Sequence, residues 1–467
     1  MTIQAKGNPL RGTFLVREPW LVAVVASLVL RSMHPSEAWS ADDPGTRHWI
    51  GTWAAAPQHS VPSRPHVFRS QTLRLIVHTS AGGNTIRIRL SNTFGDQPLT
   101  IGRARIARRT AGANIDVASD RPLTFGTHSS TTIPAGAMTV SDPVDLLVPP
   151  LSDLAVSLFL PNRTVATTVH ILAQQTNYVS TETGDSTAAV SFPVERTISF
   201  WPFLTGVEVT ASPRSRAIVA FGSSLTDGDG STTDANRRWP DVLSERLAKS
   251  SEAQFGALNE GIIGNRLLSD SKSPRQSGGP PPLGPVFAEL GIALGQSGLE
   301  RFDRDVVSQS GVTYVIIALG VNDILFPGAF VPATESVTAH DLIAGYLRLV
   351  SRAHEHGIRA IGTTIPPFEH AAFRDPDFDG FFTPEKEMVR DEVNTWIRNG
   401  GECDGVIDFD AAVRDPKHPT QLLPAYDSGD HLHVNDAGNA AQANAISLRL
   451  FRNHQPEGRR PNHGRQP

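Results

Sequence analysis

The chain has 467 residues, about twice the length that one hydrophobic core comfortably serves, so two domains are expected. Hydrophobic residues make up 39% and charged residues 19% of the chain, which excludes disorder throughout. The net charge is -5 and no stripe of Lys and Arg occurs, so no nucleic-acid partner is expected.

The N-terminal segment has the pattern of a secretory signal peptide. Two arginines precede an apolar stretch from Trp20 to Leu30, and the small residues around 38–40 offer a cleavage point. The stretch is too short to cross a bilayer, so no membrane span is expected. Cys403 is the only cysteine, which excludes an internal disulfide. We predict that residues 1–40 are a signal peptide of an exported bacterial protein; the alternative is a disordered or buried N-terminal segment.

From residue 48 to about 210, apolar side chains recur with period two. The runs 86–90 and 154–160 alternate in the way that is typical of strands with one face in a core. The glycine-rich residues 81–84 separate two such runs, which predicts a hairpin turn. We expect residues 41–212 to form an all-β, jelly-roll-like sandwich.

Beyond Ser212, short apolar strands alternate with helical patterns. The expected strands are Ala217–Phe221, Ala257–Asn259, Tyr314–Leu319, Ala360–Thr364 and Val406–Phe409. The expected helices are Trp239–Ala248, Leu342–His356, Pro384–Asn399 and Asp436–Phe451. Such alternation is typical of a parallel sheet covered by helices on both faces, a three-layer α/β/α domain. We assign this domain to residues 213–453 and expect a flexible tail over 454–467.

Four polar segments lie at the ends of predicted strands or shortly before a helix. In GSSL, residues 222–225, Ser224 follows a strand at the edge where open α/β sheets bind ligands. Asp430 precedes His433 by three residues, so its carboxylate can orient the imidazole as a general base for a serine. Gly264 in NEGIIGN and Asn322 in GVND could donate N–H groups to an oxyanion. Each segment alone is also compatible with a simple turn or helix cap.

Together and in this order, the four motifs resemble those of the SGNH hydrolase superfamily, the GDSL esterases and lipases, over residues 215 to about 452. The β-rich front domain makes the chain similar to secreted bacterial two-domain members, including the carbohydrate acetylesterase branch. The resemblance implies Ser224 as nucleophile, His433 as base and then acid, and Asp430 as the carboxylate that orients it. It also implies an oxyanion hole made of the N–H groups of Ser224 and Gly264 and the Asn322 side chain.

Residues beside the assigned nucleophile and beside the assigned Asp–His pair could fill the same roles. The family usually has Asp at the position of Ser223, and we expect Ser223 to hydrogen-bond within the turn while Ser224 remains the nucleophile. Asp427 and His431 could replace the later Asp–His pair, but only the later pair fits the spacing of the motif.

An acidic segment, residues 375–380, has the composition of the start of a calcium loop. Lys386 stands where an EF-hand needs a bidentate carboxylate, so a solvated acidic turn is the favoured interpretation and a calcium site the alternative. The segment 227–231 fails the same test at Arg238. The sequence has no His-Glu-x-x-His, no cysteine pair and no phosphate-binding Gly-x-x-x-x-Gly-Lys, so no catalytic metal and no cofactor are predicted.

The predicted function is that of a secreted serine esterase acting on a small-molecule or carbohydrate ester, with short acyl groups such as acetyl favoured by the resemblance. The phenylalanine-rich loop from Pro366 to Phe382 either packs on the domain, which we favour, or forms a pocket for an acyl or aryl group. A lipase or aryl-ester hydrolase that uses this loop is the first alternative. The second is a glycan-binding protein with an inert hydrolase domain, in which the β-sandwich binds the glycan.

Overall fold

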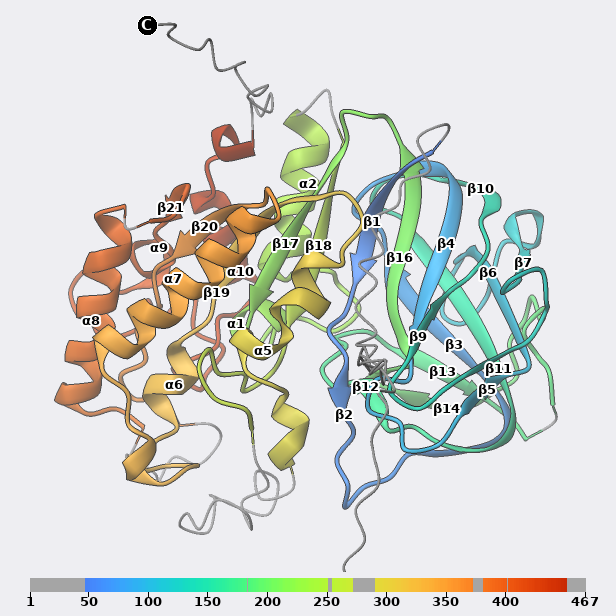
Figure 1. Cartoon of the computed structure of the whole chain (residues 1–467), viewed down its shortest axis with the longest axis horizontal. Helices are drawn as coiled ribbons and strands as arrows, with labels where there is room; N and C mark the ends of the chain where they lie inside the picture. The colour runs from blue at the N-terminus through green and yellow to red at the C-terminus, as the bar shows by residue number, and fades with distance from the viewer. Residues whose placement is uncertain are drawn as a thin grey trace, which may run out of the picture. The chain divides into compact units, whose positions relative to one another are not determined.

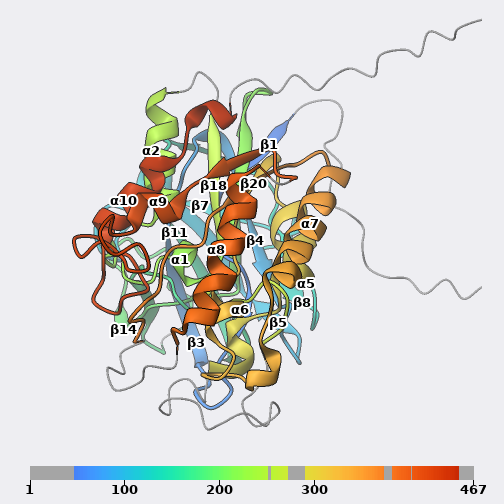
Figure 2. The ribbon, with the colours of Figure 1, turned by 90° about the vertical axis from the view of Figure 1, so that its left-hand side faces the viewer.

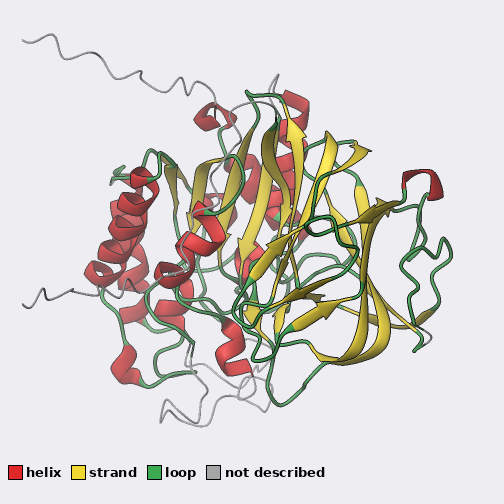
Figure 3. Ribbon diagram, turned by 45° about the vertical axis from the view of Figure 1, so that its right-hand side comes forward, coloured by secondary structure: helices red, strands yellow, loops and turns green. Residues whose placement is uncertain are grey.

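Strands dominate the N-terminal part of the chain, and strands alternate with helices in the C-terminal part (Figure 3). The computed structural model describes residues 47–182, 184–250, 254–271, 290–372, 381–400 and 402–451. The predicted signal peptide (1–40), acidic turn (375–380) and tail (454–467) lie outside the described residues. We call residues 48–211 the β region and residues 216–451 the α/β region. Both belong to one compact unit.

The β region contains sixteen strands among the described residues. They are β1 His48–Ala54, β2 Gln58–His59, β3 Val67–His78, β4 Gly83–Ser91, β5 Leu99–Ile101, β6 Arg103–Arg108, β7 Arg121–Leu123 and β8 Thr131–Ile133. The others are β9 Met138–Val140, β10 Val144–Val148, β11 Asp153–Val165, β12 Thr168–His170, β13 Asn177–Ser180, β14 Val194–Ile198, β15 Trp201–Pro202 and β16 Leu204–Ala211.

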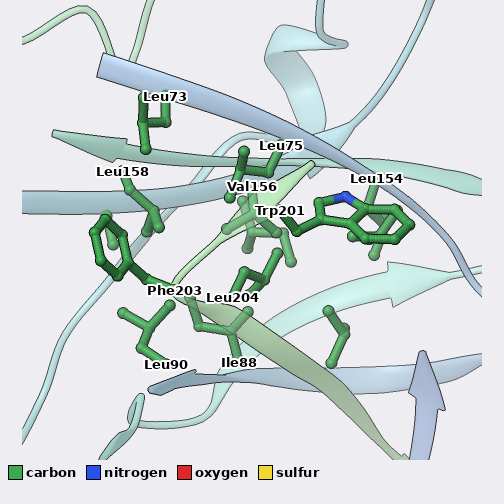
Figure 4. Close-up of a cluster of buried hydrophobic side chains, with 14 of the residues drawn as sticks. Leu73, Leu75, Ile88, Leu90, Leu154, Val156, Leu158, Trp201, Phe203 and Leu204 are labelled. Carbon is green, nitrogen blue, oxygen red and sulfur yellow. The ribbon is translucent and has the colours of Figure 1, made fainter. Parts of the chain in front are cut away.

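Two antiparallel sheets of the β region face each other as the predicted sandwich. One has the order β1-β16-β4-β10, with β9 beside β4, and the other has the order β14-β13-β3-β11-β6-β7. Alternate apolar side chains of both sheets meet in a common core, as Figure 4 shows for Leu73 and Leu75 of β3, Leu154, Val156 and Leu158 of β11 and Ile88 and Leu90 of β4. A short third sheet, β15-β12-β2, supplies the strand that bears His170.

The prediction of a hairpin turn at residues 81–84 is wrong. The flanking strands β3 and β4 belong to different sheets, so the chain crosses the sandwich there. The N–H groups of Ser80 and Ala81 bond to Thr52 of β1 instead of closing a turn. Gly83 lies so close to β16 that a Cβ atom would stand 2.4 Å from the Thr210 carbonyl oxygen. The glycines therefore serve close packing between strands, a use that resembles a turn signal in sequence.

The α/β region is built on a parallel sheet of order β18-β17-β19-β20-β21. Its strands are β17 Arg216–Gly222, β18 Phe255–Gly261, β19 Val312–Ala318, β20 Arg359–Thr363 and β21 Gly405–Ile407. The helices described are α1 Ser224–Asp227, α2 Trp239–Ser250, α5 Gly298–Phe302, α6 Val321–Leu325, α7 Ala339–Glu355, α8 Pro384–Arg398, α9 Phe409–Val413 and α10 Asp436–Ala445. The strand order reverses beside β17, and ligands of open α/β sheets bind at such a point, beyond the carboxyl ends of the strands.

Helices cover both faces of this sheet, as predicted (Figure 1). Ala217, Val219 and Phe221 of β17 pack into a core with α5, α7 and α8. Ile218 and Ala220 point the other way, into a core with α2, α9 and α10. Figure 2 shows α7 and α8 side by side over their face. Alternate residues of β17 thus enter two different cores, one on each face of the sheet. The sheet therefore lies between two layers of helices.

One predicted helix ends earlier than expected. The segment 436–451 was predicted as a single helix, but α10 ends at Ala445 and a separate 3₁₀ turn follows at Leu448–Phe451. Arg246 of α2 donates to the carbonyl oxygens of Ala443 and Ile446 and so satisfies the helix end from a neighbouring element.

Candidate active site

The turn that follows β17 presents Ser224. Gly222 ends the strand, Ser223 is extended (φ -106°, ψ -155°), and α1 begins at Ser224 and ends after one turn at Gly228. Gly228 has φ +107°, a left-handed conformation that favours glycine. The turn holds Ser224 at the carboxyl edge of the sheet with 2% of its surface exposed.

Ser224, His433 and Asp430 form a continuous hydrogen-bonded series. Ser224 Oγ lies 2.8 Å from His433 Nε2, and His433 Nδ1 lies 2.6 Å from Asp430 Oδ2. A carboxylate only accepts, so Nδ1 carries the proton that faces Asp430 and Nε2 of the neutral ring accepts from the Ser224 hydroxyl. The structure therefore brings together three sequence-predicted residues that are up to 209 positions apart.

The Asp430 carboxylate is held in its charged form. Burial alone would raise the pKa of Asp430, but hydrogen bonds from the His433 ring and from the backbone N–H groups of His433 and Leu432 outweigh burial. They hold that pKa well below its usual range. A permanently charged acceptor fixes the ring orientation and favours the imidazolium that forms when His433 takes a proton.

The rival pair occurs in the same loop but is turned away from the serine. His431 Nδ1 lies 2.5 Å from Asp427 Oδ2, and the His431 side chain is 50% exposed. The hydrogen bond to Ser224 comes from His433, whose side chain is 1% exposed. Two Asp–His pairs thus form side by side, and only the later one reaches the serine hydroxyl.

Hydrogen bonds join the Gly264 and Asn322 segments to the serine turn. The Ile262 N–H donates to the Gly222 carbonyl oxygen at 3.1 Å, and Asn322 Nδ2 donates to the Asn265 carbonyl oxygen at 2.9 Å. The second bond orients the Asn322 amide and leaves one of its two N–H groups for another acceptor. Gly264 has φ +69°, and a Cβ atom there would stand 2.8 Å from Leu294. Glycine is therefore required at this position.

Asp323, next to Asn322, anchors the same loop. Its buried carboxylate accepts the N–H groups of Leu267 at 2.7 Å and Leu268 at 2.9 Å. Burial raises the pKa of Asp323 to about 6, although these two hydrogen bonds oppose the rise.

The expected hydrogen bond of Ser223 within the turn is absent among the described residues. The Ser223 hydroxyl is buried there without a partner. The N–H group of Thr226, which a capping side chain could bind, donates to the Ser223 carbonyl oxygen instead.

Two further acidic residues near Ser224 were not identified from sequence. Asp227, the last residue of α1, pairs with His170 of the β region at 2.9 Å. Asp229 Oδ2 lies 3.8 Å from His433 Nε2. The string of Asp and Gly at 227–230 signalled a polar turn, but no sequence signal connects it to His170, which is 57 positions away.

The described part of the chain contains no group of three His, Cys, Asp or Glu side chains suited to a metal ion. Lys386, at the twelfth position from the start of the acidic segment, lies in α8 and donates to the Leu325 carbonyl oxygen. None of the helices described has the length and apolar character needed to cross a bilayer.

This region is similar to one known protein family and to parts of several solved structures. Residues 218–446 match the family described as GDSL-like Lipase/Acylhydrolase. Among solved structures, the aryl esterase of M. smegmatis is similar at 19% identity and a TM-score of 0.35, covering 49% of this chain and 95% of that one. A carbohydrate acetylesterase from Sinorhizobium meliloti is similar at 19% identity and 0.34, with 49% and 95% covered. A GDSL-like lipase from Bacteroides thetaiotaomicron is similar at 15% and 0.32, with 50% and 88% covered. No curated protein sequence matches the chain.

The buried carboxylate of Asp323 predicts a distinct pH dependence of stability. Its pKa of about 6 lies above the ordinary value of 3.8, so the folded protein binds the proton more tightly and loses stability as pH rises from about 4 to about 6. Asp323→Asn removes this titration. The difference in free energy of unfolding between wild type and variant should therefore fall by about 3 kcal/mol between pH 4 and pH 7, measured by urea unfolding. A difference that stays constant with pH would contradict the prediction.

Proposed function

We propose that this carboxylic ester hydrolase, which belongs to the SGNH hydrolase superfamily through a GDSL-like lipase/acylhydrolase domain, cleaves short acyl esters with Ser224 as the nucleophile. The observation that carries the assignment of Ser224 is its 2.8 Å hydrogen bond to a histidine whose other nitrogen is bound by a charged carboxylate. A serine acquires nucleophilic character when a base so placed removes its proton.

In the proposed mechanism, His433 Nε2 takes the Ser224 proton as Oγ attacks the ester carbonyl carbon. The resulting imidazolium returns the proton to the leaving alkoxy oxygen, so the alcohol departs and the acyl group remains on Ser224. Water then attacks the acyl-enzyme with His433 as the base, which releases the acid and restores the hydroxyl. Asp430 keeps its charge throughout and stabilises the imidazolium.

The negative charge that develops on the carbonyl oxygen needs donors fixed in advance. We assign this role to the N–H groups of Ser224 and Gly264 and to the Asn322 amide. Within the described residues, no hydrogen bond engages the N–H group of Ser224 or Gly264. The bond from Asn322 to Asn265 places the third donor beside the second segment.

Short acyl groups are favoured over long ones by the packing of the phenylalanine-rich loop. Phe368 and Phe381 are completely buried in the core of the α/β region, and Phe382 packs on that core with its ring 5.8 Å from Phe368. These side chains are used for packing and do not line an open acyl pocket. The Phe381 ring also packs against Phe330, with the two ring centroids 5.1 Å apart. Acetyl esters, including those on carbohydrates, are the substrates we favour.

We also propose that the protein is exported, on the basis of the apolar segment and the small residues within 1–40. Expression of the full chain in a bacterial host should yield a protein outside the cytoplasm whose N-terminal sequence begins near Ala41. Recovery of the intact N-terminus from the cytoplasm alone would contradict export.

Substitution of the two adjacent serines tests the nucleophile. Ser224→Ala should lower kcat for p-nitrophenyl acetate by about 10⁴-fold or more, because the attacking oxygen is lost. Ser223→Ala is the matched control and should change kcat by less than about tenfold. Asn322→Ala should lower kcat by about 10²–10³-fold with a smaller effect on KM. An inactive Ser223→Ala beside an active Ser224→Ala would reverse the assignment, and turnover unaffected by Ser224→Ala would leave the glycan-binding alternative.

A series of p-nitrophenyl esters from acetate to palmitate tests acyl length. The value of kcat/KM should be highest for acetate or the next longer esters and fall with chain length, because Phe368 and Phe381 are buried in the core and do not bind a long acyl chain. Release of acetate from acetylated xylan, compared with p-nitrophenyl acetate, tests the carbohydrate substrate. A maximum at long acyl chains would favour the lipase alternative.

A further inference from the structure

A histidine of the β region contacts the helix that carries the proposed nucleophile. His170, in β12, lies with Nε2 at 2.9 Å from Asp227 Oδ1 and with Nδ1 at 2.9 Å from the Ala56 carbonyl oxygen. The side chains of His170 and Asp227 are 3% and 1% exposed. The pair is therefore a buried polar contact between the β region and α1.

Both ring nitrogens of His170 face oxygen acceptors. A neutral imidazole has one N–H group and can satisfy only one of them, whereas an imidazolium donates at both nitrogens. Burial lowers the pKa of His170, but the charge of Asp227 and the two hydrogen bonds outweigh burial and raise that pKa overall, against a smaller opposing effect of Arg238. The contact is thus a buried imidazolium–carboxylate pair.

Asp227 connects this pair to both parts of the proposed catalytic site. It is the last residue of α1, which begins with Ser224. Its Oδ2 accepts the N–H group of Ile263 at 3.0 Å, and Ile263 immediately precedes Gly264. One carboxylate therefore joins the nucleophile helix to the segment of a proposed oxyanion donor, and His170 fixes that carboxylate from the other side.

We propose that His170 is a positioning residue for ester hydrolysis, which holds Asp227 and thereby sets the distance between Ser224 and the Gly264 N–H group. This inference rests on the proposed function. It makes the β region a structural part of the catalytic site. Gln174, four residues further along, donates to the Gly228 carbonyl oxygen at 3.1 Å and fastens the end of the same helix. His170 itself does not touch the reacting atoms.

Two neutral substitutions separate the hydrogen bonds of His170. In His170→Gln, the side-chain nitrogen has the reach of Nε2 and can still donate to Asp227. In His170→Asn, it has the reach of Nδ1 and can donate only to Ala56. We expect His170→Asn to lower kcat for p-nitrophenyl acetate by about 10–100-fold with KM changed less than threefold, and His170→Gln to recover most of that loss.

His48→Ala provides the matched control. His48 Nε2 bonds the Ser215 carbonyl oxygen at 2.9 Å, so it also links the β region to the start of the α/β region but does not contact Asp227. Its loss should lower the melting temperature and leave kcat unchanged. Equal losses of kcat in His48→Ala and His170→Asn would mean that general loosening explains both, and would overturn the positioning role.

The charge of His170 is measured in the wild-type protein by ¹⁵N NMR of the histidine rings, assigned by comparison with His170→Gln. A proton on Nε2 at pH 7.5 is expected, whether or not Nδ1 also carries one, and an Nε2 without a proton would overturn the proposal even if His170→Asn fails to fold.

Ser224→Ala, assayed in parallel, distinguishes failure of the proposed function from failure of the positioning role of His170. If it retains activity, the proposed function fails. If it is inactive while a folded His170→Asn keeps wild-type kcat, only the positioning role fails.

Discussion

The guanidinium of Arg301 holds the ends of two strands and the loop that follows the second. It donates to the carbonyl oxygens of Gly222 and Glu260 and to Asn265 Oδ1, each at 2.9 Å. Gly222 ends β17 just before the serine turn, and Asn265 follows Gly264. This buried side chain, which no strand pattern or motif spacing specifies, therefore helps to fix the relative placement of the proposed nucleophile and oxyanion donor.

A buried cation is stable only when its charge and all its N–H groups find partners. Asp305 pairs with Arg301 at 2.9 Å, and the ring of Phe221 lies 4.1 Å from the guanidinium carbon. Burial, followed by the charge of Asp305, raises the pKa of Glu260 well above its usual range. Asp305 also pairs with Arg304 at 2.7 Å. Removing one partner of such a pair typically costs about 3–5 kcal/mol. The site is thus held by an arrangement that tolerates few alternatives.

The sequence predicted the parts of the fold that depend on local patterns. Period-two runs located β4 and β11, and the alternation of strands and helices gave the layers around β17. Ser224 and the pair Asp430 and His433 could be predicted because the four ordered motifs resemble those of the SGNH hydrolases, and the resemblance implies their roles. Contacts between distant segments could not be predicted in this way. The crossing at residues 81–84, the early end of α10 and the role of Asp227 are all decided by partners remote in sequence: Thr52, Arg246 and His170.

The β region covers an edge that the parallel sheet would otherwise expose. β18 is the outermost strand of that sheet, and edge strands with free backbone groups associate with other chains unless they are covered. β1 packs against it so closely that a Cβ atom on Gly256 would stand 1.9 Å from the Gly51 carbonyl oxygen. Ser80 accepts the Ala257 N–H, which satisfies a backbone donor of β18 from the β region. The region that bears His170 therefore also covers the edge of the sheet on which the serine turn is built, and the proposed site is held by contacts from both regions.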